Sequence, residues 1–368
     1  MDATTSAGLI DAPVVKPTGR APLFAAIDLG TNNCRLLIAR PSHGGFRVVD
    51  SFSRIVRLGE GLEARGRLGE AAMQRTSDAL RICADKIARR GVAELRAVAT
   101  AACRAADNGA EFLEGVALAT GLKFEIISPR EEVELGVAAC GDLIDPHASA
   151  ALIVDVGGGS TELSFIDLDA ARRAEFDPQR GRAPIAAWRS IPIGVVNLAE
   201  RFPERPGDPT WRADMVEAVR AALADFADAD RLRSAFLQDR AHIIGASGAI
   251  TSLAGVHLNL ERYDRRKVDG LWMSCHECRA AADRLAAMSL AERALSPCIG
   301  PDRADLVLAG AAILEAVQTF WPAQQLRVAD RGLREGALRT LIWRHQRRQR
   351  GRLFTSRDAP PAVREAVG

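Results

Sequence analysis

The stretch of sequence that decides the fold is Ile153-Val154-Asp155-Val156-Gly157-Gly158-Gly159-Ser160-Thr161-Glu162. Its first residues are mostly β-branched, which is typical of a buried strand, and three successive glycines then indicate a turn. Because glycine has no Cβ, the N–H groups of this turn can converge on an anion, and the hydroxyls of Ser160 and Thr161 can add donors. The stretch therefore predicts a strand that runs into a phosphate-binding turn.

Two carboxylates flank this turn, Asp155 on one side and Glu162 on the other. Mg²⁺ takes oxygen ligands and bridges to phosphate, so paired acids beside a phosphate-binding turn are typical of a magnesium site. We therefore expect Asp155 and Glu162 to lie near a bound Mg²⁺ ion.

A weaker copy of the pattern occurs earlier in the chain. An apolar run, Phe24-Ala25-Ala26-Ile27, leads into Asp28-Leu29-Gly30-Thr31-Asn32-Asn33 and then into a second apolar run. Each turn alone is consistent with an ordinary β-hairpin, but two copies with matched acids indicate two similar α/β domains, each supplying one hairpin to a phosphate-binding cleft. A dinucleotide-binding loop or a Gly-Lys-Ser/Thr loop is not predicted, because those loops open a helix and both turns here lead into a strand.

The composition predicts a soluble, globular protein. The chain has 368 residues, of which 48% are hydrophobic and 26% are charged, which is enough for two domains with their own cores. Its formal net charge of +2 creates no global field for a polyanion, so a nucleic-acid partner is not predicted. We find no secretory signal pattern and no run of 18 apolar residues, and the seven cysteines are scattered, so we expect a cytoplasmic protein that does not bind membranes.

Helical and strand patterns alternate along the chain, so the fold class is α/β. We expect helices over 70–90, 108–120, from 129, over 214–236, 249–258, 304–320 and 336–342, and strands over 95–100, 123–128, 242–244 and 326–329. Residues 151–166 form the second hairpin, and 170–187 form a polar loop. Cys275-His276-Glu277-Cys278 has the spacing of half a zinc site but no second pair follows, so we favour two thiols on the first turn of a helix.

Several short motifs occur in a fixed order over about residues 22–342. These are Asp28–Asn32 with Arg35, Ala99–Arg104 with Asn108, Ile127–Glu132, Asp155–Glu162, Ser190–Gly194, Gly245–Gly248, Arg303–Asp305 and Gly332–Gly336. On these residues the chain resembles the exopolyphosphatase and guanosine pentaphosphate phosphatase (Ppx/GppA) family of the actin, sugar kinase and Hsp70 superfamily, in its short two-domain form. The resemblance implies two ribonuclease-H-like (actin-like ATPase) domains with a phosphate-binding cleft between them.

The adjacent acids Glu131 and Glu132 are predicted to have different roles. Ser128-Pro129-Arg130-Glu131 has the pattern of a capping box, with proline at the first helical position, so the Glu131 carboxylate should fold back onto the cap. Glu132 is then free to point into the cleft, although a solvated carboxylate in a first helical turn is the simpler alternative. In the resembled family the second Glu of this pair is proposed as the general base that activates water.

The remaining site residues follow from the hairpins and the resemblance together. Mg²⁺, or another divalent cation such as Mn²⁺, would lie near Asp155 and Glu162, with Asp28 contributing through water. Arginine binds two phosphate oxygens at once, so Arg35 and Arg104 are expected to be phosphate ligands. The predicted phosphate-binding set is Gly30, Thr31, Asn32, Asn33, Arg35, Arg104, Gly157, Gly158, Gly159, Ser160 and Thr161, with Asn33 standing where the family commonly has serine.

The chain is expected to divide into four parts. Residues 1–21 form a disordered tail, 22–144 a first domain with the catalytic glutamate, 145–344 a second domain, and 345–368 a basic flexible tail. Basic residues at 262–267 and 344–352 suggest a track for a long polyanion, although basic runs are more often solvated surfaces. The resemblance alone implies a homodimer.

The resemblance implies a Mg²⁺-dependent phosphohydrolase that releases terminal orthophosphate from inorganic polyphosphate. The hairpins would bind phosphates equally well in guanosine pentaphosphate, which is the alternative substrate. A kinase or ATPase of the same superfamily, or a sensor that binds these polyanions without turnover, remains open.

Overall fold

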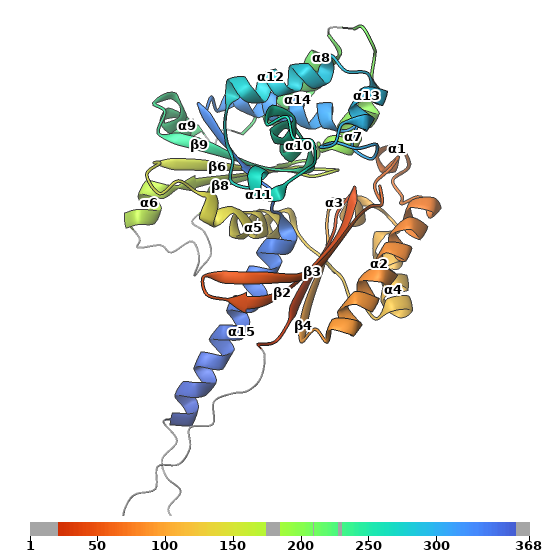
Figure 1. Ribbon diagram of the computed structural model, residues 1–368, viewed down its shortest axis with the longest axis vertical. Helices are drawn as coiled ribbons and strands as arrows, with labels where there is room; N and C mark the ends of the chain where they lie inside the picture. Colours follow the sequence, from red (N-terminus) through yellow and green to blue (C-terminus); the bar gives the residue numbers. More distant parts are fainter. Residues whose placement is uncertain (1–20, 174–184, 209, 227–229, 358–368) are drawn as a thin grey trace, which may run out of the picture.

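The structure is a computed structural model that describes residues 21–173, 185–208, 210–226 and 230–357 (Figure 1). It is an α/β fold with two mixed sheets, as the sequence predicts. Among the described residues, no helix combines the length and the apolar character needed to cross a membrane.

The first sheet has five strands in the order β3-β2-β1-β4-β5. Their bounds are β1 Phe24–Leu29, β2 Asn33–Ser42, β3 Gly45–Ile55, β4 Glu94–Ala99 and β5 Glu125–Ile126. The hairpin strands β1 and β2 are antiparallel, whereas β1 and β4 are parallel.

The second sheet repeats this arrangement and adds a strand, in the order β10-β11-β9-β6-β7-β8. Its strands are β6 Ala150–Val156, β7 Thr161–Asp167, β8 Ile185–Ile191, β9 Ala241–Ala246, β10 Trp272–Ser274 and β11 Gln325–Ala329. The hairpin β6-β7 is antiparallel and β6 runs parallel to β9, as β1 does to β4. The duplication that the two glycine turns predicted is therefore present in the topology.

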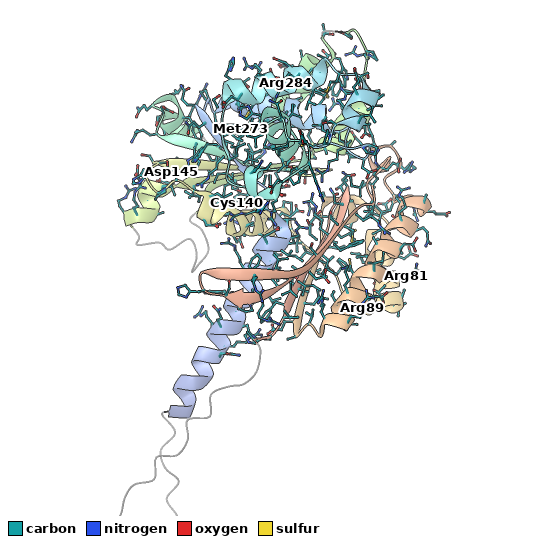
Figure 2. The ribbon with its side chains drawn as sticks, viewed as in Figure 1. Arg81, Arg89, Cys140, Asp145, Met273 and Arg284 are labelled. Atoms are coloured by element: carbon teal, nitrogen blue, oxygen red, sulfur yellow. The ribbon has the colours of Figure 1, made fainter. Side chains whose placement is uncertain are left out.

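Helices on one side of the first sheet build its main core. They are α1 Leu62–Arg65, α2 Glu70–Arg90, α3 Ala101–Ala105 and α4 Gly109–Thr120, and α2 ends at Gly91 as predicted. Alternate residues of β1, such as Ile27 and Leu29, pack into this core because successive side chains of a strand point to opposite faces. Figure 2 shows Arg81 and Arg89 of α2 on the outer side of this domain, where both are exposed.

The second sheet is covered by most of the remaining helices, on the face away from the first domain (Figure 1). They are α7 Val195–Arg201, α8 Trp211–Leu223, α9 Asp230–Leu237, α10 Gly248–His257, α11 Arg265–Val268, α12 Cys275–Ala286, α13 Leu290–Leu295 and α14 Val307–Phe320. The helix α6 Leu168–Arg173 and the 3₁₀ turn η1 Gly141–Leu143 pack on the opposite face of the sheet. Cys275 and Cys278 lie on the first turn of α12, as predicted, and Ser274 caps that helix.

Two helices cross between the sheets, α5 Pro129–Cys140 and α15 Leu333–Arg357. They approach so closely that a Cβ on Gly336 would lie 2.0 Å from the carbonyl oxygen of Leu135. The C-terminal part of α5 packs on the second sheet, and Leu338 and Ile342 of α15 pack on the first sheet. The N-terminus of α5, which carries Glu132, is therefore held at the junction of the two domains.

Three local predictions are wrong. The expected helix over 214–236 is two helices, since α8 ends at Leu223 and α9 begins at Asp230. The strand expected over 123–128 has only the two residues of β5. Of the loop expected over 170–187, residues 170–173 belong to α6 and residues 185–187 begin β8, while 174–184 lie outside the described residues.

The prediction of a flexible basic tail from residue 345 is also wrong over part of its length. Helix α15 continues to Arg357, because its polar face finds a partner in the first domain. Nδ1 of His345 lies 2.7 Å from Oε1 of Glu94, and Nη2 of Arg348 lies 2.6 Å from Oε2 of the same residue. Residues 1–20 and 358–368 lie outside the described residues, and the predicted boundary at 144/145 stays a prediction.

Candidate active site

A cavity of about 220 Å³ lies between the two domains, and both glycine hairpins line it. Nearly all of the predicted site residues line this cavity: Asp28, Gly30, Thr31, Asn32, Asn33, Arg35, Glu132, Asp155, Gly157, Gly158, Gly159, Ser160 and Glu162. These residues come from distant parts of the sequence, so the fold brings the predicted site together.

The two hairpin turns are in contact with each other. A Cβ on Gly158 would lie 3.0 Å from the backbone nitrogen of Asn32 and 3.0 Å from Cβ of Thr31. A Cβ on Gly159 would lie 2.8 Å from Oγ1 of Thr31. Glycine therefore fits at position 158, where the backbone of the other turn passes close by, and at position 159, where the Thr31 side chain does.

Both turns are built in the same way. Gly30 donates its N–H to the carbonyl of Asn33, and Gly157 donates to Ser160, each at 2.9 Å. Within the part of the chain that the structure describes, the N–H groups at positions 31, 32, 158, 159 and 160 have no hydrogen-bond acceptor. Five unpaired donors around one cavity make it suited to an anion with several oxygens.

The start of α7 fixes the second turn from behind. Val195 and Val196 donate their N–H groups to the carbonyls of Gly157 and Gly158, at 3.0 and 2.8 Å. Asn197 Nδ2 donates to the carbonyl of Gly159 at 3.2 Å. The carbonyl groups of this turn are thus used in the fold, while its N–H groups remain available.

The N-terminus of α5 presents Glu132 to the cavity. Ser128 caps the helix by accepting a hydrogen bond from the N–H of Glu131, as predicted. The Glu131 carboxylate does not fold back onto the cap, which corrects the second half of the prediction; it pairs with Arg96. Arg96 is only 8% exposed, and a buried guanidinium requires a charged partner.

The next residue of the helix, Glu132, is 4% exposed and lines the cavity.

Arg104 lies beside Glu132 and is not among the residues that line the cavity. Its Nη2 is 3.2 Å from Oε2 of Glu132, and its Nη1 donates to the carbonyl of Ile127 at 2.7 Å. In this arrangement the guanidinium compensates the charge of the buried carboxylate. The predicted contact of Arg104 with phosphate stays a prediction.

Thr161 does not line the cavity. It is fully buried at the start of β7, and its hydroxyl donates to the carbonyl oxygen of Ile193 at 2.7 Å. Its predicted contact with phosphate stays a prediction.

The acids of the cavity are buried close to one another. Burial raises the pKa of Glu132 to about 8, with a further increase from Glu162, while Arg104 opposes it. Burial and a neighbouring carboxylate raise the pKa of Asp155 to about 7 and that of Glu162 to about 7. Burial also raises the pKa of Asp28. A cation placed among these groups would be strongly favoured over protons.

The cavity contains polar atoms that fit a bound Mg²⁺ ion. Three buried oxygens, Oδ1 of Asp28, Oδ1 of Asn32 and Oδ1 of Asn33, have no hydrogen-bond partner among the described residues, so each can accept a bond from a bound group. No group of three or more His, Cys, Asp or Glu side chains in the described ranges is placed to hold a metal ion alone. Mg²⁺ is usually held by one or two carboxylates with water and substrate phosphate completing the shell, and the residues fit that mode.

One further contact orients an acid of the cavity. Ser190, which faces Glu162 across the pairing of β7 and β8, donates its hydroxyl to Oε1 of Glu162 at 2.8 Å. Ser190 belongs to the motif Ser190–Gly194, for which no role was predicted from the sequence. Its position could be found only once the register of β8 was known.

The cavity continues beyond the hairpins along a part that the sequence analysis did not predict. This part is lined by Ser247, Gly248, Thr251, Tyr263, Arg303 and Asp330. Ser247 caps α10, and the hydroxyl of Tyr263 donates to Oδ2 of Asp330 at 2.7 Å. Burial and the nearby Arg35 lower the pKa of Arg303. Tyr263 lies in no motif, so nothing in the sequence pointed to it.

The chain is similar to several known proteins. The model of the Ppx/GppA phosphatase family matches residues 37–345. Exopolyphosphatase 2 of Mycobacterium tuberculosis is 30% identical over 301 residues, which cover 79% of this chain and 88% of that protein. The crystal structure of the Aquifex aeolicus family member is 29% identical, with a TM-score of 0.69 over 88% of this chain and 98% of that one. An exopolyphosphatase-like protein of known structure is 28% identical, with a TM-score of 0.73 over 88% and 98% of the two chains.

The family model spans residues 37–345, which include the second hairpin and most of both domains, and the Aquifex aeolicus structure covers 88% of this chain. A similarity of this length is too long to come from one shared motif. The chain therefore belongs to the Ppx/GppA phosphatase family.

Proposed function

We propose that the protein is a phosphoanhydride hydrolase that releases the terminal orthophosphate of inorganic polyphosphate. The observation that supports this most strongly is the contact between the two glycine turns, which groups unpaired N–H donors beside the buried carboxylate of Glu132. Polyphosphate is the first substrate because the M. tuberculosis relative is named an exopolyphosphatase.

The two turns would hold the terminal phosphates from opposite sides. The free N–H groups of Thr31 and Asn32 come from the first domain and those of Gly158, Gly159 and Ser160 from the second. Phosphoryl transfer needs donors fixed in advance for the charge on the equatorial oxygens. Contact between the turns and the bonds from α7 supply this rigidity.

Glu132 would act as the general base. A water molecule in line with the terminal P–O bond gives its proton to the Glu132 carboxylate as its oxygen attacks phosphorus. The bond to the bridging oxygen breaks, and the shortened chain leaves with the electron pair of that bond. A base is most effective when its pKa is near the working pH, and burial brings that of Glu132 to about 8.

Mg²⁺, or another divalent cation such as Mn²⁺, would be held near Asp155 and Glu162, with Asp28 contributing through water. When bound, such an ion polarises phosphoryl oxygens and offsets their charge. The hydrogen bond from Ser190 keeps one oxygen of Glu162 in a fixed orientation.

Guanosine pentaphosphate is the second candidate substrate. The cavity extends past the hairpins to Tyr263 and Arg303, which gives room and polar contacts for a group beyond the phosphates. Polyphosphate would need only the anion-binding part of this region, whereas a nucleoside would use the hydroxyl and ring of Tyr263 as well.

The proposal is tested by orthophosphate release from long polyphosphate, guanosine pentaphosphate and ATP in parallel, with Mg²⁺ and with a chelator. Mg²⁺-dependent release that is fastest from polyphosphate supports an exopolyphosphatase. Faster release from guanosine pentaphosphate assigns the second candidate. ADP formation that requires an added acceptor, or tight binding of polyphosphate without release, would overturn the proposal in favour of a kinase or a sensor.

A further inference from the structure

The loop between β3 and α1 rests directly on the first hairpin turn. The N–H groups of Val56 and Arg57 both donate to the carbonyl of Asn32, at 2.9 and 3.1 Å, and Gly59 donates to the carbonyl of Thr31 at 2.9 Å. A Cβ on Gly59 would lie 2.2 Å from Cγ2 of Thr31, so no space separates the two segments. The loop and the turn must therefore move together.

The same loop reaches across to the second domain. Nη1 of Arg57 lies 2.9 Å from Oδ2 of Asp305, and Nη2 lies 3.0 Å from Oδ1, so the guanidinium binds the carboxylate at two points. Nη2 also donates to the carbonyl of Asp302 at 3.3 Å. Asp305 follows Arg303 and precedes α14, and Arg303 lines the cavity.

A second contact runs parallel to this one. The N–H of Gly61 donates to Oε1 of Glu200 at 2.9 Å. Glu200 lies on α7, the helix whose first residues fix the second hairpin turn. The loop thus joins the first turn to the two segments that position the second half of the cavity.

The backbone of Arg57 is in an unusual conformation. Its φ is 48°, in the left-handed region that a long side chain rarely adopts. The other described non-glycine residues with positive φ are Asp239 and Asn259, whose short polar side chains tolerate it better. Such strain persists only where surrounding contacts fix it, and here the conformation directs the guanidinium toward Asp305.

We propose that Arg57 and Asp305 form an interdomain clasp, a pair of positioning residues that holds the two hairpin turns at the spacing needed for substrate; this rests on the proposed function. Neither side chain lines the cavity, so the clasp acts through the bonds to Thr31 and Asn32 and through Arg303. The side chains are 33% and 38% exposed, so the pair is weak enough to open for exchange of substrate and product. An exposed pair of this kind shifts the fraction of closed protein, and with it the apparent affinity, by roughly three- to fivefold.

The clasp is tested by a cycle of variants. Arg57→Asn removes the guanidinium while keeping a residue that tolerates positive φ, and Asp305→Asn removes the charge of the partner with little change in shape. The double variant completes the cycle, and Arg57→Asp combined with Asp305→Arg exchanges the charges. Glu60→Gln is the matched control, since it breaks an ion pair of the same loop, 2.8 Å long to Arg75, that stays within one domain.

With inorganic tripolyphosphate as substrate, we expect each single variant to raise KM roughly three- to fivefold and to change kcat less than twofold. The double variant should be no worse than either single variant, and the exchanged pair should recover most of the lost affinity. The difference in KM from wild type should shrink as salt is raised, because salt screens exposed pairs. Unchanged KM in the single variants, additive effects in the double variant, or an equal effect of Glu60→Gln would overturn the clasp.

A ligand-free measurement separates the clasp from the proposed function. Small-angle X-ray scattering should give a larger radius of gyration for Arg57→Asn and Asp305→Asn than for wild type and Glu60→Gln. This outcome would support the clasp even if wild type released no phosphate, a result that would contradict only the proposed function. Identical radii for all four proteins would overturn the clasp whatever the activity.

Discussion

Nη2 of Arg104 lies 3.2 Å from Oε2 of Glu132, so a guanidinium sits directly behind the carboxylate that faces the cavity. Burial alone would keep this acid protonated at neutral pH, and the arginine opposes that effect. The proposed base can therefore lose its proton in the range in which a water molecule must be activated.

Replacing Arg104 by glutamine should move the pH dependence of the reaction. Removal of the positive charge raises the pKa of Glu132 above about 8, and the base is active only when deprotonated. The acid limb of the kcat/KM profile for polyphosphate should therefore shift to higher pH, with activity at pH 7 falling more than at pH 9. A uniform loss at every pH would instead indicate that Arg104 contacts the phosphate, as the sequence had suggested.

Without metal, the protein should become less stable as pH rises from about 4 to 8. The pKa values of Asp155, Glu162 and Glu132 in the folded state, about 7, 7 and 8, exceed their ordinary values, so folding binds protons. Their contribution to stability is complete below the pKa values of the unfolded chain and is lost as pH rises through the pKa values of the folded protein. The temperature of thermal unfolding, measured with chelator at pH 5, 6.5 and 8, should therefore fall as the pH rises.

Asp155→Asn is the matching variant, because it removes one of these charges. At pH 8 with chelator it should unfold at a higher temperature than wild type, and Mg²⁺ should stabilise it less than it stabilises wild type. A lower unfolding temperature than wild type under these conditions would contradict the repulsion among the buried acids.

Gly158→Ala should reduce activity at least tenfold while leaving the protein folded, since small displacements of reacting groups are costly. The added Cβ would lie 3.0 Å from the nitrogen of Asn32, so the two turns must separate. Gly115→Ala on α4 is the control, because a Cβ there meets nothing within 4 Å and should be neutral or stabilising by about 0.5–1 kcal/mol. Phosphate release and circular dichroism compare the two, and full activity of Gly158→Ala would show that the turns need not touch.

The features that were predicted correctly from the sequence depend on residues close together in the chain. The Asp-x-Gly turns, the proline at the start of α5 and the glycine after α2 each fix local structure, and the duplication of the hairpins predicted the paired sheets. The family follows from the order of the motifs and is confirmed by the comparisons. The predicted metal set and the role of Glu132 stay predictions.

The features that could not be predicted from the sequence depend on contacts between residues far apart in the chain. Glu131 pairs with Arg96 on β4, a partner that no capping pattern reveals. Helix α15 continues past His345 because Glu94 of the first domain is within reach. Thr161 belongs to the glycine motif, yet its hydroxyl donates a hydrogen bond to the carbonyl oxygen of Ile193 in a neighbouring segment.

The most direct test of the account is phosphate release by Glu132→Gln, with Glu134→Gln as the control on the same helix, where Glu134 pairs with Arg130. Glutamine keeps the shape of the side chain but cannot accept the proton of water, so Glu132→Gln should lose at least about a hundredfold in kcat for polyphosphate and still bind it. Glu134→Gln should retain nearly full activity. Turnover by Glu132→Gln within a few-fold of wild type would contradict the assignment of Glu132 as the base.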